Sequence, residues 1–123
     1  MKKNNLQKQF KKITTRIKNL EQIIANAGKK IKALEKQGCE YNASPLWKIQ
    51  KTNKTGGTTK YLRLSYGYHR YKYIGNDPAK IKSALAAVDR ARTAENLKDL
   101  QRREQRELNA LLAGVTDLIR EHC

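Results

Sequence analysis

The sequence predicts an α+β fold that is mainly helical: a long antiparallel helical hairpin, packed as a coiled coil, with a three-stranded antiparallel β-sheet at its tip. Three observations predict it: an unbroken heptad repeat near the N-terminus, alternating residues and turn signals in the middle, and a second amphipathic pattern that follows a helix-capping pair. We expect one elongated domain over residues 1–123, with a heptad helix at 3–37, a loop at 39–46, the sheet at 47–75 and a long helix at 77–121.

The first helix is predicted by apolar residues that recur at alternating spacings of four and three. These residues are Leu6, Phe10, Ile13, Ile17, Leu20, Ile24, Ala27, Ile31 and Leu34. Such a stripe is typical of a helix that packs against a partner helix along its whole length. Gly28 is a weak point within it, because glycine costs about 1 kcal/mol relative to alanine inside a helix. Gly38 predicts the end of the helix.

The face of this helix that lies away from the heptad stripe is almost purely basic. The lysines that we expect there are Lys8, Lys11, Lys12, Lys18, Lys29 and Lys32. A face that meets only water is normally mixed in sign. We therefore expect this basic stripe to follow the phosphates of a polyanion, and a solvated helix face is the alternative.

Three strand signals follow, at 47–52, 60–66 and 69–74. The second connection is short, and it predicts a two-residue type II′ turn with Gly67 in the first central position and Tyr68 in the second. This turn would pair Tyr66 with His69, Leu64 with Tyr71 and Leu62 with Tyr73.

Alternation along the paired strands sorts their side chains onto two faces. The predicted apolar face holds Trp47, Ile49, Leu62, Leu64, Tyr66, His69, Tyr71 and Tyr73. The predicted basic and polar face holds Lys48, Gln50, Tyr61, Arg63, Ser65, Arg70, Lys72 and Ile74. On this pairing Tyr66, Tyr71 and Tyr73 are core, and the basic face is the binding surface. A shift of register by one residue would exchange the two faces and reverse this assignment.

The second helix is predicted to begin at Asp77, a good N-cap, and Pro78, a good first helical residue. We expect Leu34 to lie near Ile81 and Leu6 near residues 105–110. The C-terminal part of the second helix would then extend past the first. The apolar residues of this overhang are Leu111, Leu112, Val115, Leu118 and Ile119. Exposed apolar stretches of this kind usually meet a partner, so we expect a homodimer through them.

Charge is the strongest single property of the chain, with a net charge of +16 over 123 residues. Residues 1–38 carry +9, residues 39–77 carry +5 and the remainder carries +2. Such a charge is self-repulsive unless DNA, RNA, an anionic membrane or an acidic protein neutralises it. Neither a signal-peptide apolar stretch nor an apolar run of the roughly 18 residues that span a bilayer is present. We expect a cytoplasmic protein with its two cysteines, Cys39 and Cys123, reduced.

Residues that would carry catalysis are not evident in the sequence. The stretch KTGGTTK lacks the ending of a phosphate-binding loop, so a hairpin loop is the better interpretation. His69 and His122 are far apart, and neither has a carboxylate or cysteine at a metal-ligand spacing. We expect no enzyme activity, no cofactor and no metal.

The stretch KYLRLSYGYHRYKYIGNDPAKI, read together with residues 47–59, resembles the arm-binding N-terminal domain of phage and mobile-element tyrosine integrases. The chain is also similar to small uncharacterised helix–sheet–helix proteins of mobile elements. The resemblance implies a three-stranded sheet that lies against a helix and inserts into the DNA major groove, with Lys48, Arg63, Arg70 and Lys72 facing DNA. It does not imply recombination, because the chain has no catalytic recombinase domain.

We therefore expect a non-enzymatic accessory or regulatory protein of a mobile genetic element that binds double-stranded DNA through the basic sheet face and the basic stripe. The candidate residues in the sheet region are Lys48, Gln50, Lys51, Lys54, Lys60, Tyr61, Arg63, Tyr68, Arg70 and Lys72. One alternative is an RNA-binding protein, with Tyr61 and Tyr68 stacking on bases. A second is a coiled-coil adaptor in a larger protein or ribonucleoprotein complex. A third, membrane-surface binding, suits the narrow heptad stripe poorly.

Overall fold

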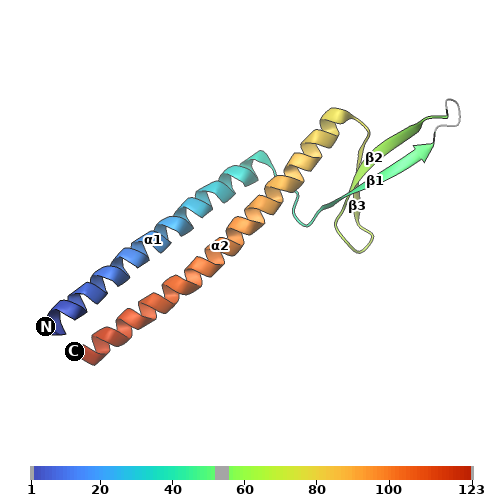
Figure 1. Cartoon of the computed structure of the whole chain (residues 1–123). Helices are drawn as coiled ribbons and strands as arrows, with labels where there is room; N and C mark the ends of the chain where they lie inside the picture. Colours follow the sequence, from blue (N-terminus) through green and yellow to red (C-terminus); the bar gives the residue numbers. More distant parts are fainter. Residues whose placement is uncertain (1, 52–55, 123) are drawn as a thin grey trace. The chain divides into compact units, whose positions relative to one another are not determined.

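The computed structural model describes residues 2–51 and 56–122 and shows an α+β fold with two helices and one three-stranded antiparallel sheet. The elements in chain order are α1 (Lys2–Gln37), β1 (Ser44–Lys51), β2 (Thr58–Ser65), β3 (Tyr71–Gly75) and α2 (Pro78–His122) (Figure 1). The helices contain 36 and 45 residues, so the chain is mainly helical. The predicted fold class is confirmed at this level.

The chain groups into two compact units, each of which contains part of both helices. The paired-helix unit comprises Met1–Lys32 and Asn96–Cys123, and the sheet unit comprises Ala33–Glu95. The six lysines of the basic stripe all belong to the first unit, and the candidate residues of the sheet region belong to the second.

In the paired-helix unit the heptad stripe is the packed face of α1. Leu20, Ala27 and Ile31 are buried, and the other stripe residues of this unit are half-buried. The two helix segments lie side by side and run in opposite directions, because Arg16 contacts Glu107 while the later residue Ile24 contacts the earlier residue Gln101 (Figure 1).

These contacts correct the predicted helix register. Because Arg16 lies beside Glu107, Leu6 lies level with a residue about ten positions beyond Glu107, and not with residues 105–110. Accordingly, α2 has no long overhang past the start of α1. Leu111, Val115 and Leu118 are half-buried, and Leu112 and Ile119 are exposed.

The sheet unit shows the physical reason for the different register. The Nε atom of Arg90 donates a hydrogen bond of 2.7 Å to the carbonyl of Gly38, so Arg90, and not Ile81, lies beside the end of α1. The backbone N–H of Glu40 donates to the carbonyl of Ala87 at 3.1 Å. The turns of α2 before Ala87 are thus free to pack on the sheet. Gly38 ends α1 as predicted, with a φ of 107° that suits glycine.

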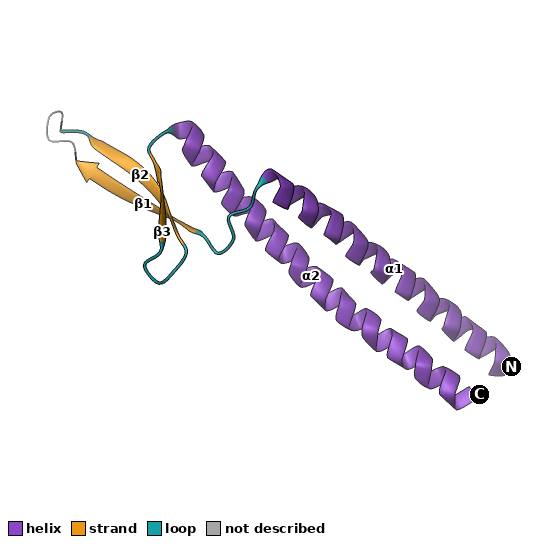
Figure 2. Cartoon of the chain, turned by 180° about the vertical axis from the view of Figure 1, so that it is seen from behind, coloured by secondary structure: helices purple, strands orange, loops and turns teal. Residues whose placement is uncertain are grey.

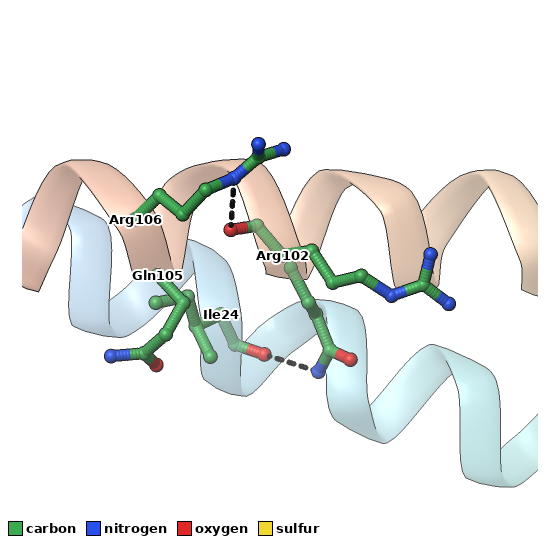
Figure 3. A pocket seen from close by; sticks show the side chains of 5 residues that line it. Ile24, Arg102, Gln105 and Arg106 are labelled. Carbon is green, nitrogen blue, oxygen red and sulfur yellow. Dashed lines mark hydrogen bonds between the residues drawn. The ribbon is translucent and has the colours of Figure 1, made fainter.

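The weak point at Gly28 has a packing reason. The Nε2 atom of Gln101 on α2 donates to the carbonyl of Ile24 on α1 at 3.1 Å, and Figure 3 draws this bond as the dashed line that ends at Ile24. A Cβ atom at position 28 would lie 3.2 Å from this Nε2 atom. The missing side chain of Gly28 therefore makes room for a hydrogen bond between the helices.

We predict that Gly28→Ala and Gln101→Ala are coupled. In the Gln101→Ala background, Gly28→Ala should raise the free energy of unfolding by about 1 kcal/mol, the helix-propensity difference. In the wild-type background the gain should be smaller, because the new methyl group must displace the Gln101 amide. Denaturant unfolding of the four proteins measures the coupling. Equal gains in both backgrounds would show that the hydrogen bond of Gln101 does not need the space left by Gly28.

The sheet has the order β1-β2-β3, so β1 and β3 are its edges. Figure 2 draws the strands of this sheet in orange. Strand β1 begins at Ser44, three residues before the predicted start, which shortens the predicted loop at 39–46. It includes Pro45, which an edge strand tolerates because the missing N–H is not needed by a further strand. Trp47 lies opposite Leu62 and Lys48 opposite Tyr61, as the alternation predicts.

The predicted register between β2 and β3 is wrong by one residue at Arg63–Ser65, and by two at Leu62, which lies opposite Gly75 after an irregularity in the pairing. Arg63 lies opposite Tyr73 and Ser65 opposite Tyr71. The turn is formed by Gly67–Arg70, since the N–H of Arg70 donates to the Gly67 carbonyl at 3.0 Å. Its two central residues, Tyr68 and His69, have φ angles of 50° and 61°. Positive φ at both central positions is what a type I′ turn requires. The N–H of Tyr66 donates to the Arg70 carbonyl at 2.9 Å, so three residues, Gly67–His69, connect the paired Tyr66 and Arg70 where two were predicted, and the register moves by one.

The register correction exchanges the faces of β3, as expected for a shift of one residue. We call the two surfaces the inner and the outer face of the sheet. The inner face comprises Pro45, Trp47, Ile49, Leu62, Leu64 and Lys72, and the outer face comprises Leu46, Lys48, Gln50, Tyr61, Arg63, Tyr71 and Tyr73.

Only part of the inner face forms a core. Leu62 and Leu64 are completely buried, and Leu64 lines one hollow together with Ala84 and Ala87 of α2. Trp47 and Ile49 on the edge strand share the face of Leu62 and Leu64, as predicted, but they stay 49% and 65% exposed. The core of the sheet unit is therefore concentrated on β2 and α2.

Candidate nucleic-acid interface

The centre of the outer face is a stacked pair of side chains. The guanidinium carbon of Arg63 lies 4.1 Å from the centroid of the Tyr71 ring. The Nε atom of Arg63 is buried and has no hydrogen-bond partner among the described residues. Stacking on an aromatic ring holds a guanidinium flat while leaving its edge available for donation. Arg63 is thus a half-buried cation whose guanidinium lies against the Tyr71 ring.

A second ring contact lies on the same face. The rings of Tyr61 and Tyr73 are 6.2 Å apart between centroids and tilted by 31°. Tyr73 is 68% exposed and Tyr71 is 44% exposed, so neither is the core residue that the sequence predicted. Rings of this kind can offer part of their surface to a ligand, and the outer face combines them with Arg63 and Lys48.

The charge around these rings has one sign. Residues 41–76, which contain the whole sheet, hold seven lysines and arginines and no aspartate or glutamate. Lys48 and Gln50 are exposed on the outer face, opposite Tyr61 and Thr59. A surface of this composition attracts anions and repels basic partners.

The structure separates the candidate residues of the sheet region into groups. Lys48, Gln50, Tyr61 and Arg63 share the outer face, as predicted. Lys51, Lys60 and Lys72 follow the inner-face alternation, which also extends to Arg70 just before β3. For Arg70 and Lys72 this corrects the prediction, and the cause is the shifted turn. Tyr68 lies in the turn, and Lys54 lies outside the described residues.

Lys72 has a partner that the sequence analysis missed. Its Nζ atom donates to Glu40 at 2.8 Å, and the Tyr66 hydroxyl donates to the other oxygen of the same carboxylate at 2.7 Å. The hydrogen bonds from Lys72 and then from Tyr66 lower the pKa of Glu40. Burial, followed by the hydrogen bond to Glu40, raises the pKa of Tyr66 to about 12. We call these three residues the Glu40 clamp, and it joins the loop after α1 to both strands of the β2–β3 hairpin.

The Glu40 clamp predicts a loss of stability in strong alkali. Between pH 10 and pH 12 the unfolded chain releases the Tyr66 proton while the folded chain keeps it, so the free energy of unfolding should fall as the pH rises through this range. The fall should be smaller in Tyr66→Phe. Chemical unfolding at several pH values checks this. Tyr68→Phe, which removes a hydroxyl from an exposed ring, is the control, and an equal effect of both substitutions would contradict the account.

The paired-helix unit has its own basic surface. Lys8, Lys11, Lys12, Lys18, Lys29 and Lys32 are all exposed, as predicted. The sequence analysis missed two arginines on the other helix, Arg102 and Arg106, which line an open hollow of about 630 Å³ with Ile24 (Figure 3). Arg16 is compensated by Glu107, with N–O distances of 2.9 and 3.0 Å to its two oxygens.

Other kinds of site find little support in the part of the chain that the structure describes. Within residues 2–51 and 56–122, His, Cys, Asp and Glu side chains do not gather into a group that could hold a metal ion. The same residues include no helix with the length and apolar character needed to cross a membrane. Comparisons with protein-family models, curated proteins and solved structures found no match.

Proposed function

We propose that the chain is a non-enzymatic nucleic-acid-binding protein with an accessory or regulatory role, and that it binds double-stranded DNA through the outer face of its sheet and the basic stripe of α1. The observation that carries this proposal is the stacking of Arg63 on Tyr71 within a surface that lacks acidic residues. An origin in a mobile genetic element rests on the sequence resemblance alone.

The outer face has the donors that duplex recognition needs. A guanidinium of fixed orientation can donate two parallel hydrogen bonds to a phosphate or to the O6 and N7 atoms of guanine. Gln50 supplies an amide, which pairs with adenine in the same groove, and Lys48 supplies a point charge for phosphate. Arg63 is the residue that would give preference among DNA sequences. Lys48 would raise affinity for every DNA sequence alike.

We further propose that the two helices form an antiparallel coiled-coil hairpin that carries the sheet at its tip. The burial of the heptad stripe and the Arg16–Glu107 and Ile24–Gln101 contacts support this arrangement. The basic stripe faces away from the heptad stripe and would add phosphate contacts. Leu112 and Ile119, seven residues apart and about half exposed, are the residues left to support the homodimer or an adaptor role.

Titration of labelled duplex DNA, single-stranded DNA and duplex RNA at several salt concentrations tests the proposed function. We expect the tightest binding to duplex DNA and a steep loss of affinity as salt rises, because counterions are released from each neutralised phosphate. Preference for RNA would favour the RNA-binding alternative. If the protein bound none of the three ligands at low salt, the proposal would be contradicted, and the adaptor role would be the remaining alternative.

A further inference from the structure

The turn between β2 and β3 is built from residues that are poorly suited to its backbone. Gly67, Tyr68 and His69 have φ angles of 83°, 50° and 61°, so three consecutive residues lie in the left-handed region. Type I′ turns are usually made with asparagine and glycine, which adopt this region at little cost. A bulky residue held there is strained, and such strain persists where the residue has a function.

The strained turn presents an open aromatic ring. Tyr68 is 96% exposed, far more than Tyr71 or Tyr73 on the outer face. His69 and Arg70 beside it are exposed as well. Residues 41–76 hold no acidic residue, and the Glu40 carboxylate that Tyr66 contacts is paired with Lys72, so the surroundings of the ring suit a polyanion and not a basic partner. A ring without packed neighbours can stack on a second flat group.

We infer that Tyr68 stacks on an unpaired base of the bound nucleic acid and that the type I′ turn exists to present it; this inference rests on the proposed function. Inside an undistorted duplex both surfaces of each base are covered by neighbouring bases, so a ring at a turn stacks most readily where a base is unpaired. The preferred ligand is therefore duplex DNA with an unpaired base beside the segment that contacts the outer face.

The probe is a DNA duplex with one unpaired 2-aminopurine, compared with the same duplex in which the 2-aminopurine is paired. Wild type should bind the unpaired form more tightly and quench its fluorescence. Tyr68→Asn should lose about 5- to 150-fold in affinity for the unpaired form, the range for one base stacked on an aromatic residue, and should bind the paired form as wild type does. Tyr68→Phe keeps the ring and should behave as wild type.

A double variant, Tyr68→Asn with His69→Gly, separates the ring from the turn. It should unfold at a higher temperature than wild type, because both new residues suit the left-handed region, and it should still lose the preference for the unpaired base. Equal weakening of both duplexes by Tyr68→Asn, or no weakening of either, would overturn the inference while the proposed function stands. Absence of wild-type binding to either duplex would overturn both.

Discussion

Replacing Arg63 by glutamine should weaken binding to duplex DNA by about tenfold or more, because one well-placed arginine contact to a base contributes roughly 1–3 kcal/mol. The same change should reduce discrimination between DNA sequences. Arg63→Lys should recover little of the loss, since lysine keeps the charge but lacks the planar fork that stacks on Tyr71. Titration of labelled duplexes of several sequences measures both effects.

The matched control for Arg63→Gln is Arg70→Gln. Both substitutions remove one arginine charge from the sheet unit, but the alternation places Arg70 on the inner-face side. The Arg70 variant should show only a small loss, equal for all sequences, as expected from a change in general charge. If the two variants lost affinity equally, the orientation of Arg63 on Tyr71 would have no role in recognition. Circular dichroism should first confirm that each variant is folded.

The largest expected effect on stability is at Leu64. This β2 side chain is completely buried and lines the same hollow as Ala84 and Ala87 of α2, and leucine-to-alanine changes at such sites cost about 2–5 kcal/mol. Small domains are stable by only about 5–15 kcal/mol, so Leu64→Ala should unfold a measurable fraction of the sheet unit at room temperature. Leu46→Ala, on the outer face at 38% exposure, should cost much less.

Fluorescence of the single tryptophan allows unfolding of the sheet unit to be followed separately from unfolding of the helices. Trp47 lies in β1 opposite Leu62, so its fluorescence reports on the sheet unit, while helical circular dichroism reports mainly on the helices. In Leu64→Ala the fluorescence transition should move to lower denaturant more than the helical transition does. An unchanged fluorescence transition would show that the sheet does not depend on the contact between Leu64 and α2.

The parts of the fold that could be predicted are those set by long patterns. Nine apolar positions at heptad spacing determine the packed face of α1, and an error at one position would not change the result. The start of α2 was also predicted correctly from its capping residues. The N–H of Ala79 donates to the Asp77 carboxylate at 3.2 Å, and Pro78 is the first residue of α2. The heptad stripe of α1 and the capping residues of α2 therefore predict the same structure that is observed.

The β2–β3 register could not be predicted, because it depends on one turn. The motif Gly67–Tyr68 fits a type II′ turn, and the structure instead places Tyr68 and His69 in a type I′ turn that normally uses asparagine and glycine. The connection between the paired Tyr66 and Arg70 thus has three residues instead of two, and this single difference transferred Tyr71 and Tyr73 from the predicted core to the outer face. It transferred Lys72 from the predicted interface to the Glu40 clamp.

The Glu40 clamp and the helix register could not be predicted for a different reason. Glu40 lies in an irregular loop, 26 and 32 residues before its two partners, and no periodic signal links residues at such separations. The helix register depends on how much of α2 the sheet occupies, and this became known only from the contacts of Gly38 and Glu40 with α2.

The measurement that tests the central claim most directly compares the two faces of the sheet. One variant carries Lys48→Gln and Arg63→Gln on the outer face, and the other carries Lys60→Gln and Arg70→Gln on the inner side, so each loses one lysine and one arginine. Both are titrated against duplex DNA over a range of salt. We predict a large loss of affinity and a shallower salt dependence for the outer-face variant, and a small loss for the inner-side variant. Equal losses, or a greater loss on the inner side, would contradict the claim that the outer face binds nucleic acid.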